Sequence, residues 1–237
     1  MFSGIIQGCF PIIKVLRKRG LTTFTVNIGK LSKGLKKGNS VSVDGVCLTV
    51  AKLGGKTATF DAMKETLSKT TIGQVSEGRK VNIERSVRIG DEIGGHNVSG
   101  HVHGTAEIVN VEKPKNNWIV TFKCDKKWMK YIFPKGFIAL DGASLTVVDV
   151  DKKEAIFTVY FIPETLKLTT FGFKKKGDRV NMEIDQQTHV IVDTLEAFLK
   201  EKIRQYQLSA TGYSASKSTP QGESKYFLAN SEALYTP

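Results

Sequence analysis

The chain has 237 residues, of which 40% are hydrophobic and 24% are charged. This composition allows one large or two small folded domains and argues against wholesale disorder. No apolar run approaches the ~20 residues that a helix needs to cross a bilayer, so we expect no membrane protein. The net charge of +12 suggests nucleic acid as a partner, but Lys outnumbers Arg 28 to 7 and the charges are scattered, which argues against that class.

The N-terminus and the cysteines indicate the cellular compartment. The segment 1–6 is mostly apolar, and the first basic residues follow it. This order is the reverse of that in a secretory signal peptide. Cys9, Cys47 and Cys124 are an odd number without Cys-x-x-Cys spacing, which is typical of reduced thiols and predicts no zinc site. We therefore expect a cytoplasmic protein.

The chain repeats itself. Five short motifs of the first half return in the same order in the second half, 96 to 99 residues later. The matching segments are 3–8 and 99–104, 44–50 and 141–147, 65–67 and 164–166, 70–73 and 169–172, and 78–84 and 177–183. So many ordered matches indicate a duplicated domain. We place the two copies at residues 1–96 and 97–185.

Each copy is predicted to be all-β. Short runs of β-branched residues are separated by glycine-containing turns, and the two Asp-Gly pairs of the repeat are strong signals of tight hairpins. The predicted strands include 40–43, 47–50, 57–60 and 80–84 in the first copy, and 118–122 and 155–160 in the second. Many short strands in a unit of this length favour a small closed barrel, because closure leaves no exposed sheet edge.

The hydrophobic period changes after the second copy, where an amphipathic helix is predicted over residues 186–206. The apolar residues at helical spacing are Ile191, Leu195, Phe198, Leu199 and Ile203. This apolar stripe either docks on the barrels or bundles with copies from other subunits. Residues 207–237 are rich in Ser, Thr, Ala, Gly and Lys, and we expect a flexible tail there.

The polar residues after the two Asp-Gly turns are the first candidates for chemistry. Cys47 and Thr49 alternate onto one face of a strand in the first copy, as Ser144 and Thr146 do in the second. A structural interpretation, a hairpin turn followed by a strand, accounts equally well for the two turn aspartates. No histidine lies nearby in sequence to act as a base, so a nucleophilic triad is unsupported and hydrogen bonding to a polar heterocycle is favoured.

The segment 94–104 contains three of the four histidines of the chain, His96, His101 and His103. On a strand, His101 and His103 would direct their rings to the same side. This spacing suggests a metal site, but no cluster of acidic or cysteine ligands accompanies it, so we expect none. We expect His101 to contact a ligand or to handle a proton. The chain has no phosphate loop, dinucleotide fingerprint or His-Glu-x-x-His motif.

These motifs resemble those of one enzyme family. The matching segments are 1–5, 45–50, 63–67, 94–101, 134–147 and 162–166, and the similarity extends from residue 1 to about residue 206. In this order they are similar to the riboflavin synthases of the α-subunit type. The resemblance implies two tandem six-stranded Greek-key barrels and a C-terminal helix that assembles a homotrimer, with each site formed by the N-terminal barrel of one subunit and the C-terminal barrel of its neighbour. It implies no metal and no redox cofactor.

The resemblance also implies a reaction. Two molecules of 6,7-dimethyl-8-ribityllumazine dismutate, and one gives a four-carbon unit to the other. The products are riboflavin and 5-amino-6-(ribitylamino)uracil, and the reaction is the final step of riboflavin biosynthesis. Each type of barrel would hold one of the two identical substrates, which gives the duplication a chemical sense. Lumazine synthase is a candidate protein partner, whereas a nucleic acid or a membrane is not.

The family's site residues carry over to the matching positions. The first-barrel pocket would use Gly4, Ile5, Ile6, Cys47, Leu48, Thr49, Asp61, Ala62, Met63, Lys64, Glu65 and Thr66. The second-barrel pocket would use Gly100, His101, Val102, Lys135, Ser144, Leu145, Thr146, Tyr160, Phe161, Ile162, Pro163, Glu164 and Thr165. The candidates for proton handling and nucleophile delivery are His101, Ser144 and Cys47, with Thr49 and Thr146 as orienting groups.

Two rival interpretations are weaker. The lumazine and flavin antenna proteins of luminous bacteria share this fold and hold a ligand without converting it. Those relatives have lost motifs in one half, whereas both halves are intact here. A basic nucleic-acid-binding barrel would need aromatic residues arrayed on one face, and the 13 Phe of this chain are dispersed. We therefore predict the enzyme, and we assign no role to His103, whose position varies in the family.

Overall fold

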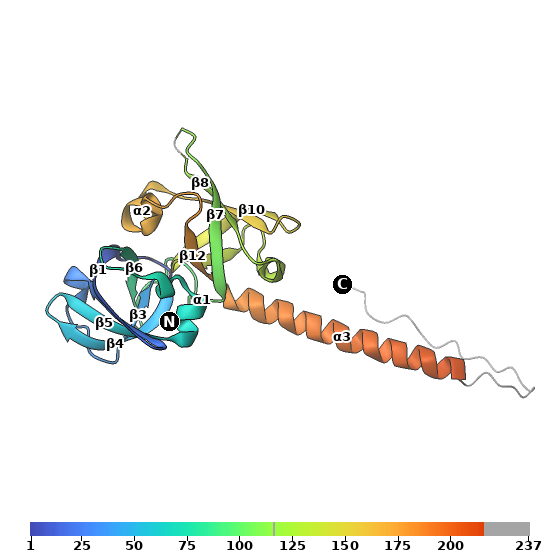
Figure 1. Cartoon of the computed structure of the whole chain (residues 1–237). Coiled ribbons are helices and arrows are strands. Elements are labelled where there is room, and N and C mark those ends of the chain that lie inside the picture. Colours follow the sequence, from blue (N-terminus) through green and yellow to red (C-terminus); the bar gives the residue numbers. More distant parts are fainter. Residues whose placement is uncertain (116, 216–237) are drawn as a thin grey trace, which may run out of the picture. The chain divides into compact units, whose positions relative to one another are not determined.

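The structure is a computed structural model that describes residues 1–115 and 117–215, with side chains up to Leu208. Contacts group Met1–Asp193 as one compact unit that contains two barrels, and the residues from Thr194 onward as a second unit. Figure 1 shows the first barrel in blue to cyan and the second in green to brown. The part of the predicted tail at 216–237 lies outside the described residues.

The first barrel, which we call the N-barrel, closes six strands in the order β1-β2-β5-β4-β3-β6. Its strands are β1 (Gly8–Lys18), β2 (Leu21–Asn27), β3 (Ser40–Val43), β4 (Val46–Gly54), β5 (Thr57–Met63) and β6 (Lys80–Arg85). A short helix, α1 (Lys64–Lys69), follows β5, and 3-10 turns lie at Gly29–Ser32 and Thr71–Gln74. All neighbouring strands are antiparallel.

The second barrel, the C-barrel, repeats this arrangement. Its strands are β7 (Gly104–Glu112), β8 (Ile119–Lys123), β9 (Phe137–Leu140), β10 (Ala143–Asp151), β11 (Ile156–Tyr160) and β12 (Arg179–Ile184). Helix α2 (Pro163–Leu168) follows β11, and 3-10 turns lie at Lys126–Tyr131 and Thr170–Gly172. The closed order β10-β11-β8-β7-β12-β9 is the same ring as in the N-barrel. The predicted pair of duplicated, six-stranded barrels is therefore confirmed.

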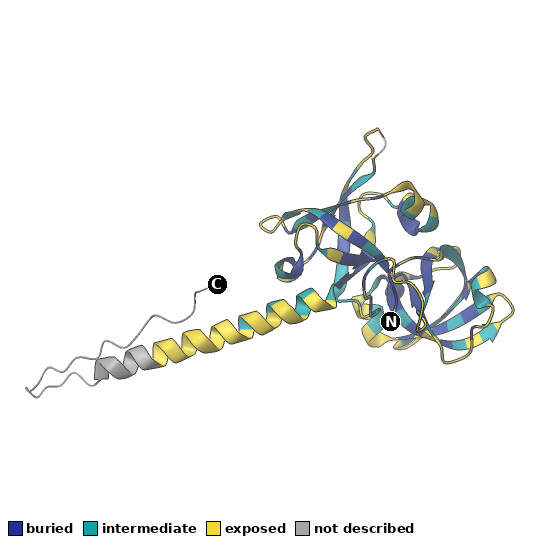
Figure 2. Ribbon diagram, turned by 180° about the vertical axis from the view of Figure 1, so that it is seen from behind, coloured by how far each residue is buried: buried dark blue, intermediate teal, exposed yellow. Residues whose placement is uncertain are grey.

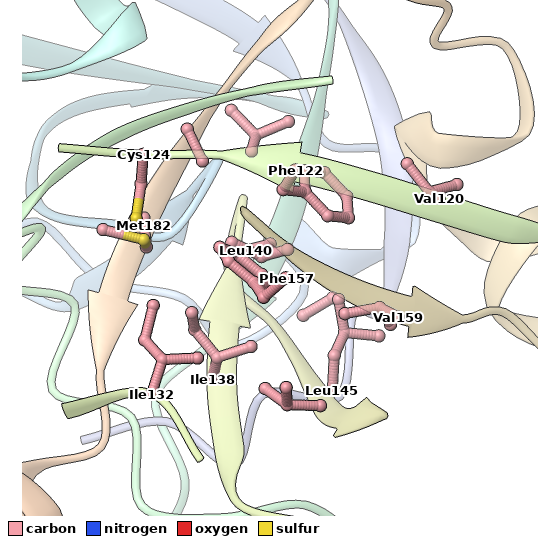
Figure 3. Packing of buried hydrophobic residues seen from close by; sticks show 14 of the residues in the cluster. Val120, Phe122, Cys124, Ile132, Ile138, Leu140, Leu145, Phe157, Val159 and Met182 are labelled. Atoms are coloured by element: carbon pink, nitrogen blue, oxygen red, sulfur yellow. The ribbon is translucent and has the colours of Figure 1, made fainter. Parts of the chain in front are cut away.

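Alternation of side chains along the strands explains why both copies close. In β4 and in β10 the pattern begins with a buried, a half-buried, a buried and an exposed residue, so every second side chain enters a barrel core. A β-bulge interrupts the register of β1, β4, β7 and β10, and bulges increase the bend that a small barrel needs. Each barrel has its own hydrophobic cluster. Figure 3 shows Phe122, Phe157 and Leu140 of the C-barrel meeting in its interior, where the two phenylalanine rings stack 5.5 Å apart.

Helix α3 (Gln186–Ala215) begins where β12 ends. The Asp185 carboxylate accepts hydrogen bonds from the Thr188 amide and hydroxyl, which caps the first turn. The helix continues nine residues past the predicted end at 206, since an existing helix adds residues such as Gln, Leu and Ala at little cost. Val190 and Ile191, the first apolar residues of its outer face, are exposed rather than packed on the barrels. Figure 2 shows most of the coloured part of α3 as exposed. Among the described residues, none of the helices combines the length and apolarity that crossing a bilayer requires.

Candidate functional site

The two Asp-Gly turns meet at the contact between the barrels. Gly45 and Gly142 both have positive φ, and a Cβ atom on Gly45 would lie 2.6 Å from the Gly142 amide nitrogen. The Asn181 side-chain amide donates to the Asp44 carbonyl at 2.7 Å. The contact is reciprocal, because the Asn82 side-chain amide donates to the Asp141 carbonyl at 3.0 Å. Only glycine allows such a close approach of two turns.

The turn aspartates are buried structural groups. The Asp44 carboxylate accepts from the Asn82 amide, and the Asp141 carboxylate accepts from the Asn181 amide, each at 2.7 Å. Arg79 lies 3.1 Å from Asp44 and Lys174 lies 3.0 Å from Asp141. Burial, and next the Asp141 charge, raises the pKa of Asp44 to about 7. The structural interpretation of these two residues therefore accounts for all their described contacts.

Cys47 and Ser144 occupy equivalent, half-buried positions on the outer face of their barrels, and Thr49 and Thr146 follow them on the same face. The intervening Leu48 and Leu145 point into the cores. The polar residues after the turns therefore face the same way, as their alternation predicts.

The loops that cover these residues come from the opposite barrel's repeat. The Ser144 amide donates to the Gly4 carbonyl at 2.8 Å, and the Cys47 amide donates to the Gly100 carbonyl at 2.9 Å. A Cβ atom on either glycine would lie 2.5 Å from the Cβ atom of its partner.

The residues that follow these two glycines also pack against the barrel of the other repeat. Ile6 belongs to the core of the C-barrel, and Val102 packs against the core of the N-barrel. The structure therefore places residues 4–6 against the C-barrel and residues 100–102 against the N-barrel, which differs from the grouping that the resemblance implies. Both loops precede the first strand of their own repeat, so repeat matching does not determine which barrel they contact.

A cavity of about 880 Å³ lies beside Cys47 on the N-barrel. Its lining includes the predicted residues Cys47, Leu48, Thr49, Asp61, Met63, Glu65 and Thr66. The Thr23 hydroxyl donates to the Asp61 carboxylate, which orients that group. Lys69 donates to the Glu65 carboxylate and lowers its pKa. Ala62 points into the barrel core and Lys64 is exposed at the start of α1, so neither side chain lines this cavity.

The equivalent surface of the C-barrel carries the second predicted group. Tyr160 ends β11, and the exposed Ile162 is the N-cap of α2. Pro163, Glu164 and Thr165 form the first turn of that helix. Phe161, in contrast, is buried in the core of the C-barrel. Lys135 is exposed in a turn with positive φ, and its amide donates to the Val147 carbonyl beside β10.

His96, for which no role was predicted, contacts Ser144. The Nδ1 atom of His96 lies 2.6 Å from the Ser144 hydroxyl, and the imidazole stacks on Phe137 with ring centroids 5.1 Å apart. Burial lowers the pKa of His96, although the Asp185 charge acts in the opposite direction, so the ring is neutral at physiological pH. No histidine is near Ser144 in sequence, but the fold brings His96, 48 positions away, into contact with it.

The two glycines before His96 are the feature of the sequence that indicates close packing at this position. A Cβ atom on Gly95 would lie 2.2 Å from the Ser3 carbonyl oxygen and 2.7 Å from the Ser144 Cβ atom. This position therefore needs glycine, and it brings the His96 ring against Ser144. A Gly-Gly-His segment thus predicts close backbone packing, but not the residue against which it packs.

His101 and His103 differ in their surroundings. Neither lies on a strand, which corrects the expectation that a strand directs both rings to one side. His101 is exposed and directly follows Gly100, which covers Cys47. His103 is held inside the structure: its Nδ1 accepts from the Ile184 amide, and its ring contacts Trp128 and His189. Within the described part of the chain, no three His, Cys, Asp or Glu side chains are grouped to hold a metal ion.

Comparisons with known proteins point to one family. The family model for the lumazine binding domain matches residues 3–86 and again residues 99–185. The riboflavin synthase of Buchnera aphidicola subsp. Schizaphis graminum is 47% identical over 205 residues, which cover 86% of this chain and 98% of that protein. The riboflavin synthase of Escherichia coli is 46% identical over 84% of this chain and 93% of that protein. That of Chlamydia pneumoniae is 43% identical over 84% and 97%.

Solved structures show the same fold. LumP complexed with riboflavin is 25% identical, with a TM-score of 0.72 over 78% of this chain and 99% of that chain. LumP complexed with 6,7-dimethyl-8-(1'-D-ribityl) lumazine has a TM-score of 0.70 over the same shares. Those two ligands contain the same kind of polar heterocycle that the Cys47 and Ser144 surfaces were predicted to bind.

Proposed function

Because the chain belongs to the lumazine-binding family and to its riboflavin synthases, we propose that its two barrels divide the riboflavin synthase reaction between them. The chain is a transferase that moves a four-carbon unit from one 6,7-dimethyl-8-ribityllumazine to another. Riboflavin and 5-amino-6-(ribitylamino)uracil together contain the same atoms as the two lumazines. The reaction as written therefore consumes no oxidant, reductant or water.

The observation that carries this proposal is the duplication of the polar surface. Cys47 and Thr49 on β4 have the same burial and direction as Ser144 and Thr146 on β10. Two identical substrates need two similar binding surfaces, and one lumazine lies against each type of barrel. Backbone amides and threonine hydroxyls hydrogen-bond the pyrimidinedione edge of the ring, and polar groups hold the ribityl chain.

The chemistry requires a proton to leave the carbon-7 methyl group of the donor lumazine and carbon 7 of the acceptor to be activated for addition. The ring delocalises the resulting carbanion, so the protein contributes chiefly by holding two rings face to face, which is worth roughly 7–11 kcal/mol. His101, Ser144 and Cys47 are the candidates for proton handling and nucleophile delivery, and the two threonines orient the rings. Among these three residues, Ser144 is the favoured candidate, because neutral His96 is hydrogen-bonded to its hydroxyl.

The complete site forms between subunits of a homotrimer, in which the N-barrel of one subunit faces the C-barrel of its neighbour. The exposed apolar residues of α3 support this assembly, because a helix with such a stripe is stabilised when copies bundle. Cytoplasmic location and association with lumazine synthase stay predictions. Light scattering on the purified protein tests the trimer, and a monomer at micromolar concentration would contradict it.

The direct test of function mixes the purified protein with 6,7-dimethyl-8-ribityllumazine in the presence of a chelator and without added cofactor. We expect riboflavin by absorbance and chromatography, at half a molecule for each lumazine consumed. The structural likeness to LumP makes a ligand-holding protein the second candidate function. Tight lumazine binding with a fluorescence change but without riboflavin would establish that candidate instead.

A further inference from the structure

We propose that two buried glutamates, Glu84 and Glu183, are positioning residues that act crosswise: each holds the loop that covers the ligand surface of the other barrel. The inference deepens the proposed function, because it concerns the same two surfaces. It adds residues that belong to neither the predicted catalytic nor the predicted binding set. It also explains how a loop from one repeat is held firmly against the barrel of the other.

Glu84 lies on β6 of the N-barrel and is 1% exposed. Its Oε1 atom accepts hydrogen bonds from the Ser3 amide at 2.7 Å and from the Ser3 hydroxyl at 2.8 Å. Its Oε2 atom accepts from the Gly4 amide at 3.1 Å. Three donors of one short loop therefore converge on a single carboxylate, which can accept all of them.

Glu183 has the same contacts in the C-barrel, on β12, where it is 4% exposed. The Ser99 amide and hydroxyl donate to its Oε1 atom at 2.7 and 2.8 Å. The Gly100 amide donates to its Oε2 atom at 2.9 Å. The two copies have kept the same three hydrogen bonds, so the arrangement is a property of the repeat.

Each held glycine then contacts the opposite barrel. The loop held by Glu84 presents the Gly4 carbonyl to the Ser144 amide of the C-barrel. The loop held by Glu183 presents the Gly100 carbonyl to the Cys47 amide of the N-barrel. A carboxylate in one barrel is thus connected, through one serine and one glycine, to the chemistry-bearing residue of the other.

The serines extend this connection to the next residue. The Ser99 hydroxyl donates to Glu183 and accepts from the His101 amide at 3.1 Å. Glu183 therefore fixes the backbone of His101, a candidate for proton handling, as well as that of Gly100. The Ser3 hydroxyl accepts from the Ile5 amide in the same way, at 3.4 Å.

A carboxylate is required at both positions. An ionised carboxylate only accepts hydrogen bonds, whereas glutamine has one accepting oxygen and an NH₂ group that donates. In a Glu→Gln variant, the NH₂ group would face a backbone N–H donor of the loop. Burial raises the pKa of Glu84 and of Glu183, and the hydrogen bonds from the serine and glycine donors oppose this by favouring the ionised form.

The test uses the Cys47 thiol as a reporter of the N-barrel surface. Cys124 is buried, and burial raises its pKa to about 12, so it does not react with iodoacetamide at neutral pH. In a Cys9→Ser background of the full chain, Cys47 is the accessible thiol. The alkylation rate of Cys47, located by mass spectrometry, is measured with increasing riboflavin as the protecting ligand.

We expect Glu183→Gln to weaken the protection of Cys47 by riboflavin about tenfold, because a charge-assisted contact that holds its covering loop is lost. Glu84→Gln removes an equivalent contact and is the matched control: it should leave Cys47 protection unchanged within about twofold, although its lost contact is of the same kind. Both variants should lower riboflavin formation. A loss of protection in Glu84→Gln, equal losses in both variants, or no loss in either would overturn the proposal.

Two further variants separate positioning from folding. Ser99→Ala and Ser3→Ala each remove only the hydroxyl contacts of their loop, so each should keep the native urea midpoint more closely than the glutamine variants. Ser99→Ala should weaken Cys47 protection and Ser3→Ala should not. Protection does not require turnover, so a crosswise pattern without riboflavin formation would contradict the proposed function but support this inference. Riboflavin formation by the wild type without the crosswise pattern of Cys47 protection would support the proposed function and contradict this inference.

Discussion

The two barrels share one scaffold but differ in the groups that surround their reactive positions. The ring order of the strands, the Asp-Gly turns and the glutamate contacts are the same in both. Ser144, however, is hydrogen-bonded to His96, whereas among the described residues no histidine is hydrogen-bonded to Cys47. The duplicated fold thus supplies two equivalent surfaces, and single residues outside the repeated strands make their chemistry different.

The charges beneath the turns differ in the same way. Asp44 is paired with Arg79, and Asp141 is paired with Lys174. When the two copies are aligned, the residue equivalent to Arg79 is Asp178 and not Lys174. The two cations therefore come from non-equivalent positions of the repeat. Both turns therefore contain a buried aspartate, and the cation that pairs with its charge comes from a different position in each copy.

The largest effect is expected where the barrels touch. Gly45→Ala places a methyl group 2.6 Å from the Gly142 nitrogen at a φ of +80°, and should lower the free energy of unfolding by about 3 kcal/mol. Gly20→Ala is the matched control, because its φ is +75° but no atom lies within 4 Å, and it should cost about 1 kcal/mol. Urea denaturation measures both. Equal losses would show that the turn contact adds nothing to the cost of the backbone conformation.

His101 belongs to the loop that covers the N-barrel surface, and its substitution should affect turnover rather than stability. His101→Gln should lower kcat about 100-fold, if the imidazole transfers a proton in the reaction, while the urea midpoint stays close to that of the wild type. Steady-state riboflavin formation measures this effect. A kcat within twofold of the wild type would remove His101 from the candidates for proton handling.

The His96–Ser144 pair should give the C-barrel a distinct pH dependence. His96→Gln should lower kcat about tenfold at pH 7.5. Because burial lowers the pKa of His96, the wild-type activity that depends on the neutral ring should persist below pH 6.5 and decline only as the pH falls through the lowered value. In the variant this acid limb should be absent. A limb of the same shape in both proteins would show that another group titrates.

Cys47→Ser places the hydroxyl of the C-barrel at the equivalent position of the N-barrel. The exchange should lower turnover a few-fold and leave the free energy of unfolding within about 0.5 kcal/mol, because the residue is half-buried and the change in volume is small. Comparing kcat with the urea midpoint separates the two effects. Unchanged turnover would remove Cys47 from the candidate catalytic residues.

The last comparison concerns Asp44→Asn, which should change the pH dependence of stability rather than turnover. The pKa of Asp44 is raised to about 7, so its contribution to stability is present at acid pH and is lost as the pH rises from about 4 to about 7. The asparagine oxygen can still accept from the Asn82 amide, and the variant should lack this part of the pH dependence. Urea midpoints between pH 4 and pH 8 measure it. Parallel curves for the two proteins would show that Asp44 does not titrate in this range.

Much of this protein could be predicted from local signals. Repeated motifs predict two copies, Asp-Gly pairs flanked by alternating residues predict hairpins, and β-branched runs predict strands that close into barrels. The same alternation places Cys47 and Thr49 on one face, because side-chain direction along a strand depends only on parity. Each of these properties depends on a few neighbouring residues, so it can be predicted without knowledge of the rest of the fold.

The tertiary structure alone decided which distant segments share a surface. The contact between His96 and Ser144 and the crossing of the loops at Gly4 and Gly100 depend on how one repeat docks on the other. The contacts of His103 with Trp128 and His189 join distant segments of the second repeat and α3. A repeat identifies equivalent positions within each copy, but the contact between copies has no local pattern. The chain by itself determined two barrels and their polar faces. Docking determined the partner of each polar residue, because segments without regular structure take their position from the surface they cover.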